Sequence, residues 1–134
     1  PQPQVCDGRI FIEGIDKMRA VDLYTGRLLW ETSLPGLGDL YNNLAHQAGA
    51  NATGANFVSA SEGIYVAYKN KCVRLDPKTG KIDQEYLLPK EADAENPPRW
   101  SYINILGDYL IGGADPDFDA AMEKQMKSPS KLLK

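Results

Sequence analysis

One turn pattern, Asp-x-x-Thr-Gly followed by a basic residue, occurs twice in the chain and constrains its fold more than any other feature. It reads DLYTGR at residues 22–27 and DPKTGK at residues 76–81. β-prone runs flank both copies, so each copy is expected to join two short strands. A reactive site would be expected once in the chain, whereas a turn that joins two strands can recur in each repeat unit. The pattern therefore predicts a repeated β architecture rather than a catalytic centre.

The residue types of this pattern suit a tight connection between antiparallel strands. Asp22 stands at the end of a strand, where a short carboxylate accepts hydrogen bonds from backbone N–H groups just ahead. Thr25 adds a second local hydrogen bond, and Gly26 supplies the positive φ that disfavours a Cβ. Because no His or second acid lies nearby in sequence, neither Asp22 nor Thr25 is expected to be catalytic. The same structural roles are expected in the second copy for Asp76, Thr79 and Gly80.

Three glycine-centred signals predict β-hairpins. They are CDGRIFIEG from Cys6, SEGIYVAYK from Ser61 and LGDYLIGG from Leu106. Each joins two β-prone runs through Asp-Gly, Glu-Gly or Gly-Asp. No amphipathic helix of roughly 10 to 15 residues separates the strands, which favours an all-β meander over a βαβ fold.

Hairpins and turns together give the expected organisation. Two units of four antiparallel strands should cover about residues 3–34 and 56–88, and the opening hairpin of a third unit should cover about 100–113. The fold class is therefore all-β within residues 1–116. Helix formers with an Asp-rich start predict a short helix and a frayed end in residues 117–134.

The first copy of the pattern extends to a longer motif, A-x-D-x-x-T-G-[KR]-x-x-W. This motif resembles the repeat of pyrroloquinoline-quinone-type (PQQ-like) β-propellers, in which four-stranded blades surround a channel. By this resemblance, Ala20 and Trp30 pack against adjoining blades. The motif is complete at Ala20, Asp22, Thr25, Gly26, Arg27 and Trp30.

The second copy departs from the motif at both packing positions. Arg74 stands in place of the alanine and Gln84 in place of the tryptophan. Close packing around this unit is thereby put in question, with Tyr86 or Tyr68 as alternatives for the packing role. The resemblance as a whole covers about residues 3–113.

About two and a half blades make an incomplete propeller, because closed propellers have about four to eight blades. The resemblance therefore implies broad apolar faces and unpaired strand edges that something must cover. Either a longer chain supplies the remaining blades, or copies of this chain associate with one another.

Composition narrows the possible partners. The 134 residues are 43% hydrophobic and 25% charged, with a formal net charge of -3, as in a globular segment. Scattered Lys and Arg predict no nucleic-acid partner. The apolar runs are far shorter than the roughly 20 residues of a membrane span, so none is expected. The start, PQPQVCDG, lacks Met and signal-peptide features, which predicts a processed product or an excised piece.

Cysteines and acidic residues are assigned structural roles. Cys6 and Cys72 fall in predicted strands of different units without Cys-x-x-Cys spacing, so structural thiols are expected and a mutual disulfide remains the alternative. The acids at positions 115, 117 and 119 alternate as at the start of a Ca²⁺ loop. Because the later Gly and Glu of such a loop are missing, they are expected to complement a helix dipole.

Candidate binding residues lie in two places. Leu40, Tyr41 and His46 stand in a long loop rich in Gly and Asn, and we expect this loop to contact a partner. His46 is the only histidine, and a surface position is expected for it rather than metal ligation. Trp100 is the second candidate, either as an aromatic recognition spot or as part of a strand core.

Two functions follow from the resemblance. The leading hypothesis is a non-catalytic PQQ-like propeller segment that acts as a binding scaffold, possesses no cofactor and binds a protein or another macromolecule. The alternative is a fragment of a PQQ-dependent quinoprotein oxidoreductase whose catalytic residues lie outside this chain, where PQQ and Ca²⁺ would bind only to the parent protein. The resemblance also implies a periplasmic or exported location.

Overall fold

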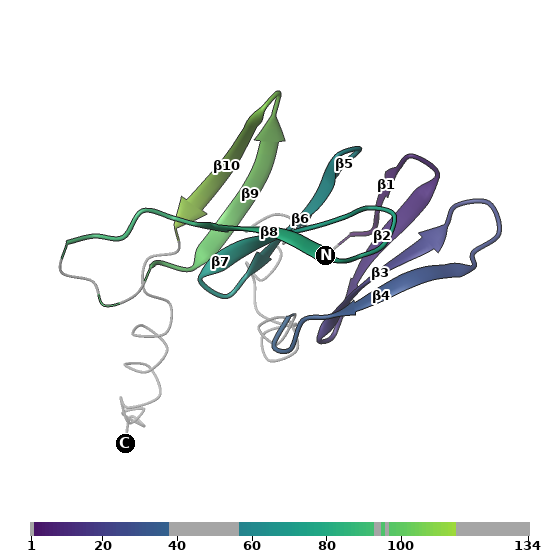
Figure 1. Ribbon diagram of the computed structural model, residues 1–134, viewed down its shortest axis with the longest axis horizontal. Coiled ribbons are helices and arrows are strands. Elements are labelled where there is room, and N and C mark those ends of the chain that lie inside the picture. Colours follow the sequence, from purple (N-terminus) through teal and green to yellow (C-terminus); the bar gives the residue numbers. More distant parts are fainter. Residues whose placement is uncertain (1, 38–56, 93–94, 96, 115–134) are drawn as a thin grey trace, which may run out of the picture.

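A computed structural model describes residues 2–37, 57–92, 95 and 97–114. Within these residues, ten strands form three antiparallel sheets, and there is no helix (Figure 1). The all-β fold class is therefore confirmed. The described strands form three open sheets and do not close into a ring. The helix expected in residues 117–134 lies outside the described part of the chain.

Each sheet is a meander in which strands that follow one another in the chain are hydrogen-bonded neighbours. Two sheets have four strands and the third has two. The first sheet contains β1 (Gln4–Cys6), β2 (Arg9–Gly14), β3 (Lys17–Asp22) and β4 (Leu28–Ser33); the second contains β5 (Phe57–Ala60), β6 (Gly63–Tyr68), β7 (Lys71–Leu75) and β8 (Ile82–Leu87); the third contains β9 (Trp100–Leu106) and β10 (Tyr109–Ala114).

The two four-stranded sheets share one register around the repeated turn. Ala20 pairs with Trp30 across β3 and β4, and Arg74 pairs with Gln84 across β7 and β8. In both sheets the register shifts immediately after this pair, at a β-bulge before the turn. The sequence repeat is therefore a structural repeat, and residues of one sheet have defined counterparts in the other.

Two of the predicted hairpin turns contain short residues with positive φ angles. Asp7 and Gly8 have φ of 47° and 73°, as a type I′ turn requires, and Gly107 has φ of 57°. The second hairpin differs from its prediction, because Ser61 and Glu62 form the turn and Gly63 begins β6. A Cβ on Gly63 would lie 2.8 Å from Nε of Arg74, so this glycine provides space for that side chain.

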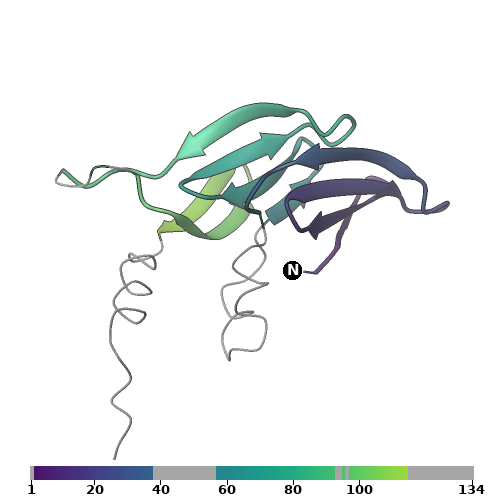
Figure 2. The ribbon, with the colours of Figure 1, turned by 90° about the horizontal axis from the view of Figure 1, so that it is seen from below.

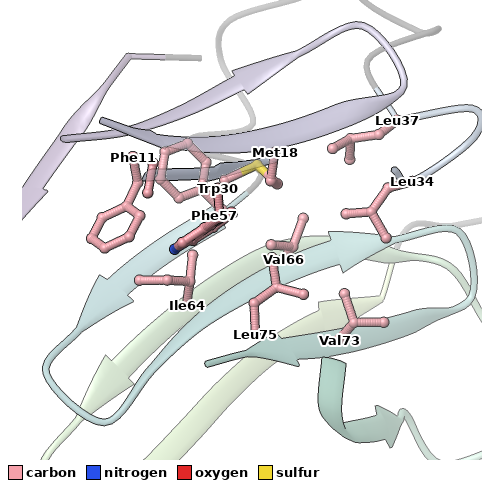
Figure 3. Packing of buried hydrophobic residues seen from close by; sticks show 11 residues of the cluster. Phe11, Met18, Trp30, Leu34, Leu37, Phe57, Ile64, Val66, Val73 and Leu75 are labelled. Atoms are coloured by element: carbon pink, nitrogen blue, oxygen red, sulfur yellow. The ribbon is translucent and has the colours of Figure 1, made fainter. Parts of the chain in front are cut away.

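The sheets stack in chain order, with the second sheet between the other two (Figures 1 and 2). One apolar core lies between the first and second sheets (Figure 3). Its buried members are Phe11, Met18, Ala20, Trp30, Leu34 and Leu37 from the first sheet and its connection, and Phe57, Ile64, Val66, Val73 and Leu75 from the second.

A smaller core lies between the second and third sheets. Its buried residues are Tyr65 and Cys72 from the second sheet, and Trp100 and Ile103 from the third. Side chains alternate between the two faces of a strand, so Ile64 and Tyr65 enter different cores. The second sheet is thus buried on both faces.

Gln4 connects the first strands of the first and second sheets. Its Nε2 donates to the carbonyl of Phe57 at 2.7 Å, and its Oε1 accepts from the backbone N–H of Ser59 at 2.7 Å and from Oγ of Ser59 at 3.0 Å. Because both ends of one amide are used, this side chain fixes β1 against β5. It adds polar contacts to the apolar core that Phe57 of β5 and Cys6 of β1 also join.

We expect Gln4→Ala to lower the free energy of unfolding by about 2 kcal/mol, because three partly buried hydrogen bonds are lost and their partners are left unpaired. Urea unfolding followed by circular dichroism measures this change. The matched control is Gln2→Ala, since Gln2 is exposed. Equal stability of the two variants would contradict the role given to Gln4.

Candidate functional site

The first copy of the repeated pattern, turn 1 (residues 22–27), is closed by the carboxylate of Asp22. Its Oδ1 accepts from the backbone N–H groups of Tyr24 and Thr25 at 3.0 and 2.8 Å, and from Oγ1 of Thr25 at 2.9 Å. The carbonyl of Asp22 accepts from Gly26 N–H at 2.8 Å, and Gly26 has φ of 68°. The turn thus has the hydrogen bonds that the residue types predict.

The second copy, turn 2 (residues 76–81), repeats this arrangement. Oδ1 of Asp76 accepts from the N–H groups of Lys78 and Thr79, both at 2.8 Å, and from Oγ1 of Thr79 at 3.0 Å. Gly80 N–H donates to the carbonyl of Asp76 at 2.8 Å, and Gly80 has φ of 71°. The two turns are therefore structurally equivalent.

Both aspartates have a lowered pKa. The main cause at Asp22 is the hydrogen bond from the backbone of Thr25, and at Asp76 it is the one from the backbone of Thr79. These bonds stabilise the charged carboxylate. Both side chains are half-buried and belong to turns, so turn closure accounts for the low pKa.

Trp30 of the first sheet docks on turn 2 of the second sheet. Its indole Nε1 donates to the carbonyl of Pro77 at 2.9 Å, and Oγ1 of Thr32 donates to the carbonyl of Gly80 at 2.5 Å. A Cβ on Gly80 would lie 2.6 Å from Cδ2 of Trp30 and 2.6 Å from Oγ1 of Thr32. Glycine is therefore required at position 80 for two reasons: the positive φ disfavours a Cβ, and the indole leaves no space for one.

Trp30 also belongs to the core between the two sheets. The indole is buried, and its ring centroid lies 6.0 Å from that of Phe11. Ala20, its cross-strand partner, is fully buried and small enough to leave room for the indole. The interaction thus combines apolar burial with two hydrogen bonds to backbone carbonyls that would otherwise lack protein partners.

The corresponding pair in the second sheet is polar. Nη1 of Arg74 donates to Oε1 of Gln84 at 3.2 Å, and Nη2 donates to the carbonyl of Glu62 at 3.0 Å. Tyr86 packs against the core between the second and third sheets, and its hydroxyl donates to Gln84 at 2.6 Å. Of the two alternatives for the packing role on this side, Tyr86 fits.

Tyr68 serves the other interface. Its hydroxyl donates to the carbonyl of Pro35 at 2.6 Å, and its ring packs against the core between the first and second sheets. Tyr68 therefore reinforces the contact with the first sheet. It does not take over the tryptophan's packing role toward the third sheet.

The sequence-predicted binding residues divide into two groups. Leu40, Tyr41 and His46 lie outside the residues that the structure describes. Trp100 is 9% exposed and its ring occupies the place of a side chain on Gly112, where a Cβ would lie 2.7 Å from Cη2. Trp100 therefore belongs to a strand core, and it does not form a surface recognition spot.

The cysteines are both free thiols. Cys72 is buried, and burial raises its pKa to about 12. Cys6 lies beside Ser61, with 3.9 Å between Sγ and Oγ. The expectation of two structural thiols is thus confirmed, and the disulfide alternative is excluded for this structure.

Two residues that help to dock the first sheet on turn 2 were not predicted from the sequence. Thr32 lies two residues after Trp30 and so points to the same face of β4, which is the signal that could have found it. Pro77 contributes only its carbonyl, which no side-chain pattern reveals. Among the residues with defined positions, no group of three or more His, Cys, Asp or Glu could hold a metal ion, and no helix is long and apolar enough to cross a bilayer.

No family model matches the chain, and no curated protein matches its sequence.

We expect Gly80→Ala to destabilise the protein by about 3 kcal/mol and Gly26→Ala by only about 1 kcal/mol. Both substitutions place a Cβ at positive φ, but only the one at Gly80 collides with Trp30 and Thr32. Chemical denaturation of the two matched variants measures the difference. Losses of equal size would show that Trp30 does not dock on turn 2.

We expect stability to fall in acid as the two turn aspartates are protonated. Because their pKa values in the folded state lie below the ordinary 3.8, they stabilise the fold above that value and lose this contribution as the pH falls through the lowered values. Asp76→Asn should flatten the decline of Tm between about pH 4 and pH 2, while lowering Tm at pH 7. An unchanged acid slope would contradict this account.

Proposed function

We propose that the chain is a non-catalytic repeat segment of PQQ-like propeller type and acts as an interaction scaffold. The observation that carries this proposal is the directional stacking of the sheets. The front face of each sheet, defined as the face that meets the next sheet in chain order, packs on the back face of its successor. Such a stack leaves one front face and one back face without a neighbour among the described residues.

The free front face belongs to the third sheet and is apolar. Leu110 packs toward the second sheet, so the adjacent Ile111 lies on the opposite face. Leu106 and Tyr109 are cross-strand partners on this same face and are 69% and 75% exposed. Tyr102 and Ile111 are also exposed there. Apolar side chains gathered on one face of a sheet are typical of a surface that meets another protein layer.

The free back face belongs to the first sheet. Val5 and Leu28 are 58% and 54% exposed and flank Ile10 and Val21 in a row across the four strands. In the second sheet, the counterparts of Ile10 and Val21 are fully buried by the first sheet. The back face of the second sheet is thus covered by the first sheet, whereas the equivalent face of the first sheet has no neighbour among the described residues.

The repeat motif itself supports a structural role. The side chains of Asp22 and Thr25 close turn 1, and the indole of Trp30 docks the first sheet on the second. The scaffold hypothesis therefore assigns a structural role to both copies of the motif, including the polar pair Arg74 and Gln84 of the second sheet. The oxidoreductase alternative, with PQQ and Ca²⁺ in a parent protein, stays a prediction for the full-length form.

The partners that suit these faces are other protein layers. Further blades of a longer chain or a second copy of this chain fit an apolar sheet face, and a protein ligand would use the same chemistry. A periplasmic or exported location stays a prediction from the resemblance.

We expect the chain to associate in a concentration-dependent manner through the front face of the third sheet. Ile111→Lys should weaken this association about tenfold, because a charge would be placed where apolar surface is buried. Light scattering over a concentration series measures it. The control is Asp83→Asn, at an exposed polar position of the second sheet.

A chain that stays monomeric at every concentration would contradict an open apolar face. Equal association of the Ile111 and Asp83 variants would show that another surface is responsible. Circular dichroism of both variants checks that the sheets remain intact.

A further inference from the structure

We propose that the free front face of the third sheet pairs with the same face of a second copy of this chain, about a two-fold axis. This inference rests on the proposed scaffold function and specifies which surface the free front face meets. The pairing differs from the stacking within the chain, in which a front face packs on a back face.

The front face of the third sheet consists of three cross-strand pairs. The pairs are Leu106 with Tyr109, Asn104 with Ile111, and Tyr102 with Gly113. Neither β9 nor β10 contains a charged residue, and the charge nearest to them along the hairpin, Asp108, lies in the turn at one end of the sheet. An uncharged face can lie against an identical face without repulsion between like charges.

The asparagine on this face already has its hydrogen bonds within the sheet. Nδ2 of Asn104 donates to the hydroxyl of Tyr102 at 3.0 Å, and Oδ1 accepts from the backbone N–H of Ile105 at 2.8 Å. A polar group that is satisfied before association costs little to bury. The centre of the face can therefore be covered by apolar surface although it contains an amide.

The free back face of the first sheet is a less suitable counterpart. Arg19 occupies the position that corresponds to Val73, which is fully buried where the first sheet covers the second. Nε of Arg19 pairs with Glu31 at 2.5 Å, and Nζ of Lys17 pairs with the same carboxylate at 2.8 Å. Head-to-tail association of two copies would bury this charged cluster beneath apolar side chains, and desolvation of the ions opposes such burial.

A two-fold axis that runs across the strands gives the most favourable orientation. It places the two hairpin turns at opposite ends of the interface, so the two Asp108 carboxylates lie far apart. It also places the central cross-strand pair of one copy over that of the other, so Ile111 meets the Ile111 of the second copy. Facing sheets pack about 10 Å apart with their mean strand directions within about 30°.

The expected interface is small. Leu106 and Tyr109 are 69% and 75% exposed, and Tyr102 and Ile111 are 45% and 41% exposed. Covering these side chains in both copies would bury roughly 900 Å² in total, which is at the low end for a specific interface. We therefore expect a reversible dimer with a Kd in the micromolar range or weaker.

An exchange of charge at Ile111 tests this arrangement in the complete chain. Ile111→Lys and Ile111→Glu should each raise the Kd of the dimer at least tenfold, because two like charges then meet near the axis. An equimolar mixture of the two variants should associate at least tenfold more tightly than either variant alone, because opposite charges then meet. Sedimentation velocity over a concentration series measures these constants. The control is Leu28→Lys on the free back face, which should leave the Kd unchanged.

A mixture that associates no better than the single variants overturns the proposal, because in a head-to-tail contact residue 111 meets a first sheet and not its own counterpart. Equal weakening by Leu28→Lys and Ile111→Lys also overturns it, as does growth beyond the dimer, since a two-fold contact closes at two copies. If circular dichroism shows that an Ile111 variant does not fold, the same exchange is made at the other central position with Asn104→Lys and Asn104→Asp.

The parent chain separates this inference from the proposed function. A parent that stays monomeric at every concentration contradicts both the open apolar face and its pairing with a second copy. A parent that associates, but whose charge variants do not recover in the mixture, contradicts the two-fold pairing alone.

Discussion

The docking of Trp30 on turn 2 is the contact on which the arrangement of the sheets depends. This one side chain is part of the core between two sheets and also hydrogen-bonds to the backbone of turn 2 in the second sheet. Turn 2 itself needs Asp76 to close it and Gly80 to leave space for the indole. Turn closure in the second sheet and packing of the first sheet on it are thereby coupled through the same residues.

The two sheets use different faces in this contact, and this difference explains which faces of the stack have no neighbouring sheet among the described residues. The first sheet offers Trp30 and a packing face to the second sheet, and the second sheet offers turn 2 and its opposite face in return. A linear series of such sheets therefore ends with one face and one turn unused. Among the described residues, turn 1 has no docked tryptophan, and the face without a neighbouring sheet carries Tyr109 and Ile111. Exposure of apolar side chains at these ends is therefore a consequence of the repeat and not of a local irregularity. It is also what makes a scaffold function physically reasonable.

Departures from the repeat are compensated locally. Where Ala20 and Trp30 pair in the first sheet, Arg74 and Gln84 pair in the second, and the larger arginine fits because Gly63 lies beneath it. A long polar side chain therefore substitutes for alanine where a glycine on the neighbouring strand provides room. Sequence alone shows the departure, but the space at Gly63 depends on which strand lies alongside.

The sequence by itself determined the strands, the hairpins and the closure of both turns, because these features depend on residues close together in the chain. Asp22, Thr25 and Gly26 are within one turn of one another, and their hydrogen bonds need no distant partner. Only the tertiary structure decided that Trp30 meets Gly80, that Trp100 is buried and that Gln4 joins two sheets. Those contacts link residues far apart in sequence, and their geometry is set by how whole sheets pack and not by any local preference.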